Sequence, residues 1–132
     1  MTDPGRRREA RERVLELLYE AEAKGWSIAD LLAELPVEPD PFALRAVRGV
    51  EEEQDEIDAL LVRFLRADWS LDRLPDVDRH VLRLATWELL SEPATPVAVV
   101  LAEAVALAKR YSTEASGRFV NGVLASIADE VR

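Results

Sequence analysis

The chain has 132 residues, 48% of them hydrophobic, which suits one domain with a single core. It contains no cysteine, so disulfides, thiolate metal sites and cysteine nucleophiles are excluded. The formal net charge is −9, but residues 1–13 hold five arginines against three acidic residues, which gives this segment +2 and leaves −11 for the rest.

Helical periodicity predicts a first helix over residues 7–23, preceded by a flexible arm over residues 1–6. Its apolar stripe consists of Val14, Leu17, Leu18 and Ala21. A short second helix is expected after Ser27, because Asp30 three residues later gives the spacing of a capping box. This helix ends before Pro36, since a proline disfavours helical geometry in the residue that precedes it.

A long third helix is predicted over residues 42–65, where apolar side chains recur every three or four residues. Its core-facing seam consists of Val47, Val50, Gln54, Ile57, Leu61 and Phe64. Three more amphipathic helices are expected over residues 76–90, over residues 96–111 and from Ser116 onward. No stretch alternates with period two, so we predict an all-α fold, a compact bundle of six to seven helices forming one domain over residues 1–132.

The inventory of side chains argues against an enzyme. His80 is the sole histidine, and we expect it to be a surface or partly packed helix residue. The sequence has no glycine-rich phosphate loop and no metal-ligand cluster, so we predict no catalytic residue, no metal site and no cofactor. No apolar run approaches the roughly 18 residues of a membrane-spanning helix, so we expect a soluble, cytoplasmic protein with no membrane partner.

The arginine cluster of the first helix is a candidate binding site. Arg7 and Arg11 share one helix face, and Arg8 lies beside both. Guanidinium groups bind phosphates through a planar fork and stack on exposed bases, which suits single-stranded RNA. The alternative is a solvated terminus in which these arginines pair with Glu9 and Glu12.

A second candidate is the stretch from Phe119 to Leu124, where a polar residue and a glycine interrupt an apolar helix. One interpretation is tight helix packing over Gly122, with Asn121 hydrogen-bonded in the core. The other makes Phe119 an aromatic at the edge of a binding face.

A third candidate is the start of the helix over residues 76–90. There Asp76 and Asp78 meet the positive end of the helix dipole, which explains them as capping residues. A charged docking site for a protein partner, with Arg79 beside them, is the alternative.

These stretches, taken in order, resemble the NusB family. The matching residues are Arg7–Glu12 leading to Leu17–Glu20, Leu74–Leu89, Glu103–Lys109 and Phe119–Leu124. The resemblance covers nearly the whole chain and leaves out only the variable stretch over residues 25–40.

The resemblance implies an all-helical fold of two subdomains and a role in processive transcription antitermination. Family members bind the boxA element of nascent ribosomal RNA together with NusE, the small-subunit ribosomal protein S-ten, and help RNA polymerase read through terminators. The RNA-binding residues implied here are Arg6, Arg7, Arg8, Arg11, Lys109, Arg118 and Phe119. The helix around Asp78 and Arg79 is implied to face NusE.

The chain departs from the family pattern at two positions. Ala102 stands where the family often has asparagine, and Ala115 stands where it has an acidic residue, beside the implied RNA edge. The acidic remainder of the chain also predicts weak RNA binding by the isolated protein. We therefore expect a composite RNA clamp that is completed by a basic partner.

Two other functions fit the same sequence. One is a helical protein–protein adaptor in which the arginines bind no RNA. The other is the NusB-like module that precedes the catalytic domain of some RNA cytosine methyltransferases, which a much longer coding sequence would favour. Self-association into a homodimer is also expected to be possible through an apolar helical face.

Overall fold

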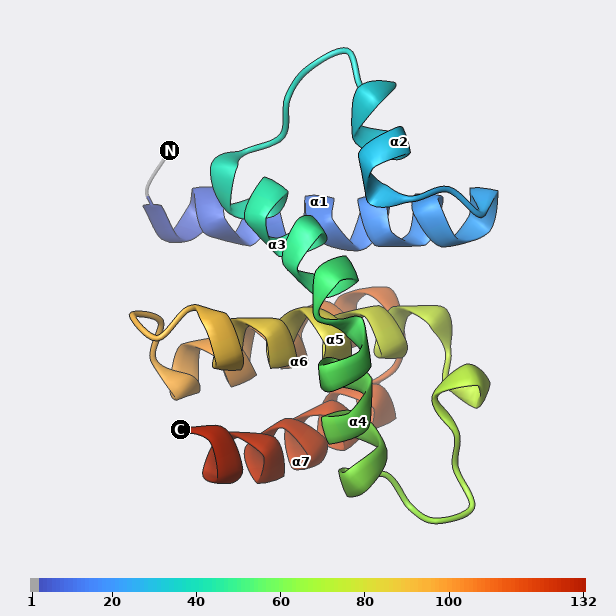
Figure 1. Cartoon of the computed structure of the whole chain (residues 1–132). Coiled ribbons are helices and arrows are strands. Elements are labelled where there is room, and N and C mark those ends of the chain that lie inside the picture. The colour runs from blue at the N-terminus through green and yellow to red at the C-terminus, as the bar shows by residue number, and fades with distance from the viewer. Residues whose placement is uncertain (1–2) are drawn as a thin grey trace.

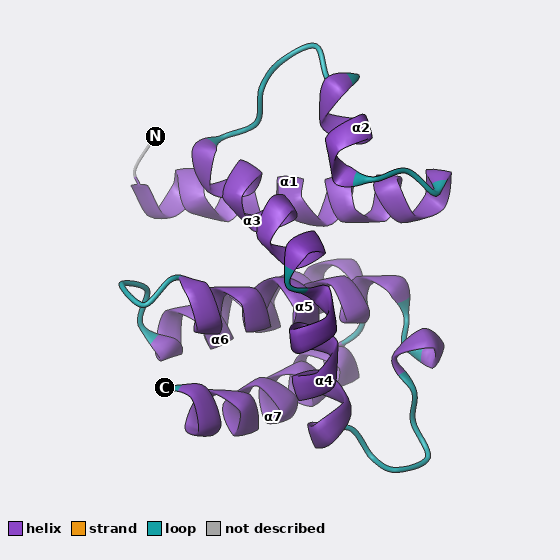
Figure 2. Ribbon diagram, in the orientation of Figure 1, coloured by secondary structure: helices purple, strands orange, loops and turns teal. Residues whose placement is uncertain are grey.

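The computed structural model describes residues 3–132, and these form α-helices, one 3-10 helix and no strand (Figure 2). The elements are α1 (Asp3–Lys24), α2 (Ile28–Ala33), α3 (Pro41–Glu52), α4 (Gln54–Phe64), the 3-10 helix η1 (Leu71–Arg73), α5 (Asp76–Ser91), α6 (Val97–Tyr111) and α7 (Glu114–Val131). The predicted all-α fold is confirmed. Figure 1 shows α1 to α3 as one subdomain and α4 to α7 as the other. Within residues 3–132, no helix combines the length and the apolar content that a bilayer crossing requires.

The first two helices follow local sequence signals. The predicted stripe of α1 is buried, with Val14 and Leu17 fully inaccessible. The Ser27 hydroxyl accepts a hydrogen bond from the Asp30 backbone N–H at 3.1 Å, which caps α2 as the spacing predicts. Residues 3–6 of the expected flexible arm lie in the first turns of α1, whereas residues 1–2 lie outside the described part of the chain.

The long helix predicted over residues 42–65 is wrong in one respect, because it is broken at Glu53 into α3 and α4. Glu53 has φ −104° and ψ 15°, outside regular helical geometry. The break redirects the chain between the subdomains, since α3 packs on α1 and α5 while α4 packs on α5 and α7. Gln54, assigned to the predicted seam, is exposed at this break.

Helix α5 is the centre of the molecule, and it packs against α1, α3, α4, α6 and α7. Every residue from Asp78 to Leu89 is buried, the charged ones included. Buried charges are costly unless they are paired, and most of these have partners on other helices, whereas Oδ1 of Asp78 has none within residues 3–132. The pairs are Arg11–Glu88 and Glu22–Arg79 with α1, Asp58–Arg83 with α4, and Ser116–Asp78 with α7. Polar contacts of α5 therefore link both subdomains.

Candidate nucleic-acid interface

Two of the predicted arginines, at the start of α1, make no ion pair within residues 3–132. Arg6 is exposed and makes no hydrogen bond or ion pair within residues 3–132. The Arg7 guanidinium lies over the ring of Phe42, with its carbon 4.1 Å from the ring centroid. These two side chains line a hollow of about 300 Å³ together with Asp40 and Arg45. The geometry leaves two cations open to an anionic ligand.

The other two predicted arginines of α1 are bound to carboxylates. Arg8 donates two hydrogen bonds to Glu103, at 3.1 and 2.9 Å, and this contact lowers the pKa of the Glu103 carboxyl. Arg11 donates two to Glu88, at 3.0 and 2.7 Å, and both side chains are buried. The Arg8 side chain remains 59% exposed and can still reach a phosphate. The guanidinium of Arg11 is enclosed in the core, so we leave Arg11 out of the proposed RNA surface.

The second predicted group gathers around the turn between α6 and α7. Lys109 crosses closely over Gly117, where an added Cβ would lie 2.8 Å from the Cγ of the lysine. Arg118 is exposed and makes no hydrogen bond or ion pair in the described part of the chain. Phe119 is half-buried and packs against Trp69, with ring centroids 5.3 Å apart. This end of the molecule thus joins two cations to an aromatic pair.

The two groups are separated along α1 and α6, because Arg8 contacts Glu103 on α6, whereas Arg110, the neighbour of Lys109, contacts Glu12 one turn further along α1. In Figure 1 the start of α1 and the end of α7 lie on the same side, so the start of α7 lies on the other. The edge between the groups contains an internal contact, because Glu12 accepts hydrogen bonds from Arg110 at 2.9 Å and from the Tyr111 hydroxyl at 3.2 Å. A single RNA strand that touches both groups must cross this edge.

The residues implied to face NusE, Asp78 and Arg79, are both buried. Asp78 accepts a hydrogen bond from the Ser116 hydroxyl at 2.9 Å. Arg79 donates to the Leu74 carbonyl at 3.2 Å and to Asp76 at 2.8 Å. These contacts hold α5 in place. Both side chains are enclosed, although Oδ1 of Asp78 has no hydrogen-bond partner within residues 3–132.

The interpretation of Asn121 and Gly122 as core residues is wrong. Both are exposed on α7, and a Cβ added at Gly122 would meet no atom within 4 Å. Neighbouring helices do not explain this glycine. The close crossing occurs instead at Gly117, one turn earlier.

His80 is buried, 4% exposed, which corrects the expectation of a surface or partly packed helix residue. Its burial lowers the pKa of the imidazole, and Arg79 and Arg83 act in the same direction. Glu22, whose carboxylate is 3.6 Å from Nε2, and Asp76 oppose the shift. The imidazole is therefore neutral in the folded protein over a wider pH range than in the unfolded chain.

We expect this histidine to make the free energy of unfolding fall as pH drops below about 6.5, the ordinary pKa of a histidine. The unfolded chain takes up a proton there that the folded protein resists, so acid favours unfolding. Urea denaturation of wild type and His80→Leu between about pH 5 and pH 8 tests this. The variant is expected to show the flatter profile, and identical profiles would contradict the assignment.

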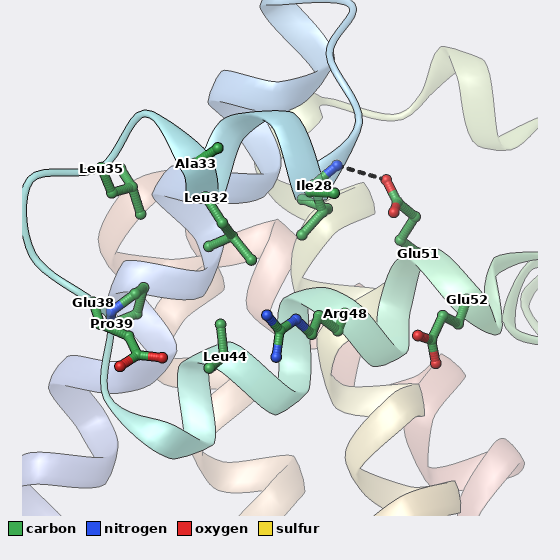
Figure 3. Close-up of a pocket in the computed structure, with 11 residues that line it drawn as sticks. Ile28, Leu32, Ala33, Leu35, Glu38, Pro39, Leu44, Arg48, Glu51 and Glu52 are labelled. Carbon is green, nitrogen blue, oxygen red and sulfur yellow. Dashed lines mark hydrogen bonds between the residues drawn. The ribbon is translucent and has the colours of Figure 1, made fainter.

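A further hollow, of about 550 Å³, lies between α2, the segment over residues 34–40 and α3 (Figure 3). Leu32, Leu35 and Leu44 line it, and Arg48 extends into it (Figure 3). Glu51 at its edge accepts a hydrogen bond from the Ile28 backbone N–H at 2.8 Å. None of the residues predicted to bind RNA or NusE lines this hollow.

Comparison with known proteins identifies the family. A model of the NusB family matches residues 8–129. The transcription antitermination protein NusB of Kineococcus radiotolerans is 44% identical over 127 residues, which are 93% of this chain and 93% of that protein. The chain belongs to the NusB family. The NusB of Sorangium cellulosum is also 44% identical, over 96% of this chain and 94% of its own length.

Solved NusB structures share the fold. The NusB of T. maritima superposes with a TM-score of 0.85 at 45% identity, over 94% of this chain and 91% of that one. A complex of the antitermination factors NusB and NusE with double-stranded RNA contains a chain that matches with a TM-score of 0.81. That chain is 30% identical, and the match covers 95% of this chain and 97% of it.

The two positions at which the sequence departs from the NusB family pattern are both exposed. Ala102 lies on α6 and Ala115 on α7. Ala115 lies three residues before Arg118, the spacing at which helix side chains meet. An acidic side chain at that position would be placed to pair with Arg118. Arg118 makes no ion pair within residues 3–132, because Glu114, four residues before it, lies 3.7 Å from Lys109 instead.

Sequence reasoning missed Trp69, which contacts the predicted Phe119. It lies between α4 and η1, in a connection without helical periodicity. Only its residue type carried a signal, since a large aromatic in a polar connection is unusual unless it packs or binds.

Proposed function

We propose that this chain is a transcription antitermination factor that binds boxA-type single-stranded RNA of nascent ribosomal RNA together with NusE, the small-subunit ribosomal protein S-ten. It acts as one half of an RNA clamp in the antitermination complex of RNA polymerase, in the cytoplasm, and performs no catalysis. Family membership supports the antitermination role, and the related complex with NusE and RNA supports the two partners.

The observation that carries the RNA proposal is the pair of unpaired cations at the start of α1. Arg6 and Arg7 are open to an anion on a chain whose net charge is −9. Most of the carboxylates would repel a polyanion, so a local cationic surface is required for any contact with RNA. The same repulsion keeps the affinity of the lone protein low and makes a second, basic subunit necessary.

The decisive test is a titration of labelled boxA-type RNA at two salt concentrations. The RNA is mixed with this protein alone, with NusE alone and with both proteins. We expect salt-sensitive binding that tightens several-fold in the mixture. Equal affinity of the lone protein and the mixture would refute the clamp. Absence of RNA binding with intact NusE binding would leave a helical protein–protein adaptor as the function.

Arg6→Glu is expected to weaken RNA binding by the NusE complex several-fold, because a phosphate contact becomes a repulsion. The slope of log affinity against log salt should become shallower by about 0.7, the value for one phosphate of a single strand. Arg48→Glu is the matched control, since Arg48 is also an exposed arginine without an ion pair but lies on α3 beside the hollow of Figure 3. Equal losses in both variants would show only a general charge effect.

The methyltransferase alternative finds no support in the curated relatives. These NusB proteins match this chain over 93% and 94% of their own lengths, which leaves them no room for a catalytic domain. Self-association stays a prediction, and the mass of the protein in solution by light scattering tests it.

A further inference from the structure

Trp69 is a fixed aromatic surface that faces solvent. Its side chain is 43% exposed, although it is the largest apolar residue type. The ring packs against Phe119 with centroids 5.3 Å apart and an interplanar angle of 44°. The backbone N–H of Trp69 donates to the Arg66 carbonyl at 2.9 Å, which closes a turn. Both contacts hold the indole in place while leaving part of its surface open.

A hollow of about 350 Å³ adjoins this indole. The residues that line it are Asp68, Trp69, Ser70, Arg73, Leu74 and Pro75, and the Asp68 carboxylate lies 3.7 Å from the Arg66 guanidinium. Its volume lies within the range of about 300–1,000 Å³ that small-molecule sites occupy. A planar ring that enters the hollow has an aromatic face on one side and polar groups at its rim.

Two unpaired cations flank the aromatic pair. Arg73 is exposed at the hollow, and Arg118 is exposed immediately before Phe119. Neither makes an ion pair or side-chain hydrogen bond within residues 3–132. Aromatic rings for bases and cations for phosphates are the combination that single-stranded nucleic-acid sites use.

Gly122 marks where a ligand can approach α7 closely. It lies four residues after Arg118 and three after Phe119, so all three face the same side of the helix. A glycine inside a helix costs about 1 kcal/mol relative to alanine, and here no neighbouring atom requires it. The bare backbone offers a close contact that any side chain would block.

We propose that Trp69, backed by Phe119, stacks an unpaired base of the bound RNA, with Arg73 and Arg118 on adjacent phosphates and Gly122 allowing the strand to lie against α7. This inference rests on the proposed function, because it assumes that the ligand is single-stranded RNA. It adds to that function a base-stacking site beside Phe119, separate from the cations at the start of α1.

The test compares Trp69→Ala with Trp26→Ala in complexes with NusE, titrated with labelled boxA-type RNA. Trp26 is the matched control, because it is 40% exposed and lies between α1 and α2. Loss of one stacked base weakens binding by about 5-fold to 150-fold, so we expect this loss in Trp69→Ala and none in Trp26→Ala. Trp69→Phe should restore most of the affinity.

A series of RNAs with one abasic nucleotide each locates the stacked base. At one position, removal of the base should weaken binding to wild type. The same removal should not weaken binding to Trp69→Ala further, because that variant has already lost the stacking contact. Gly122→Leu tests the same site independently, so the proposal stays testable if Trp69→Ala fails to fold. We expect Gly122→Leu to weaken RNA binding without lowering the free energy of unfolding.

The outcomes separate this inference from the proposed function. If wild type binds RNA and both Trp69→Ala and Gly122→Leu bind it equally well, the stacking site is refuted and the clamp stands. If wild type with NusE binds no RNA, the proposed function fails. Loss of NusE binding in Trp69→Ala would assign the surface to a protein contact and overturn the inference.

Discussion

Arg11→Ala is expected to lower the free energy of unfolding by about 3–5 kcal/mol, the usual cost of removing one partner from a buried ion pair. The substitution leaves the Glu88 carboxylate, 2% exposed, without the two hydrogen bonds that Arg11 donates at 3.0 and 2.7 Å. A buried, unpaired carboxylate is far less favourable than a solvated one. Urea denaturation followed by far-UV circular dichroism gives the difference.

The Arg8–Glu103 pair is the control, because it has the same bidentate geometry but its arginine is 59% exposed. Arg8→Ala is expected to change stability little, since water and salt screen an exposed pair. The double variant Arg11→Met with Glu88→Leu should recover most of the loss, because apolar residues of similar size remove both buried charges. Equal effects of Arg11→Ala and Arg8→Ala would show that burial does not set the strength of this pair.

The helical spacing of the sequence predicts that Arg11 is buried, but its charge favoured an interpretation as a surface residue. Arg11 lies three residues before Val14 and seven before Leu18, so it continues the apolar stripe of α1. Glu88 continues the stripe of α5 in the same way, three residues after Ala85. Two opposite charges on core-facing stripes predict a buried ion pair. Reading arginines only as RNA ligands placed Arg11 on the surface.

The parts of the fold that sequence did predict depend on local signals. Apolar periodicity gave the helices, and the Ser27 cap was correct because its hydrogen bond spans only three residues. The break at Glu53 was missed because it depends on which helices α3 and α4 pack against, and the spacing of apolar residues does not report that. Gln54 in an otherwise apolar seam was the one indication of it.

The candidate site was predictable only as a set of residue types. The resemblance selected the right charged stretches, but it could not tell Arg6, which is free, from Arg11, which is enclosed. The contact between Trp69 and Phe119 joins residues 50 positions apart, across a connection without periodicity. Such pairings arise from tertiary packing, which propensity and spacing do not specify.

Gly49→Ala is expected to destabilise the protein by about 3 kcal/mol, at the upper end of the range for overpacked cores. A Cβ added at Gly49 would lie 2.0 Å from Nε1 of Trp87, well inside van der Waals contact. The indole has little freedom to move, because Trp87 is 4% exposed and packs edge-on against Phe42 with centroids 5.9 Å apart. The overlap must therefore push α3 away from α5, which thermal and urea unfolding will detect.

Gly122→Ala is the matched control, because the same methyl group is added inside a helix where no atom lies within 4 Å. Here the helix propensity of alanine is expected to raise stability by about 1 kcal/mol. Gly49→Ala in a Trp87→Phe background should cost less than in wild type, since the smaller ring relieves the overlap. Equal penalties in both backgrounds would remove Trp87 as the cause. Stability changes of opposite sign at the two glycines would show that α3 needs Gly49 for packing, whereas folding does not need Gly122. A position kept open for a ligand is expected to behave in this second way.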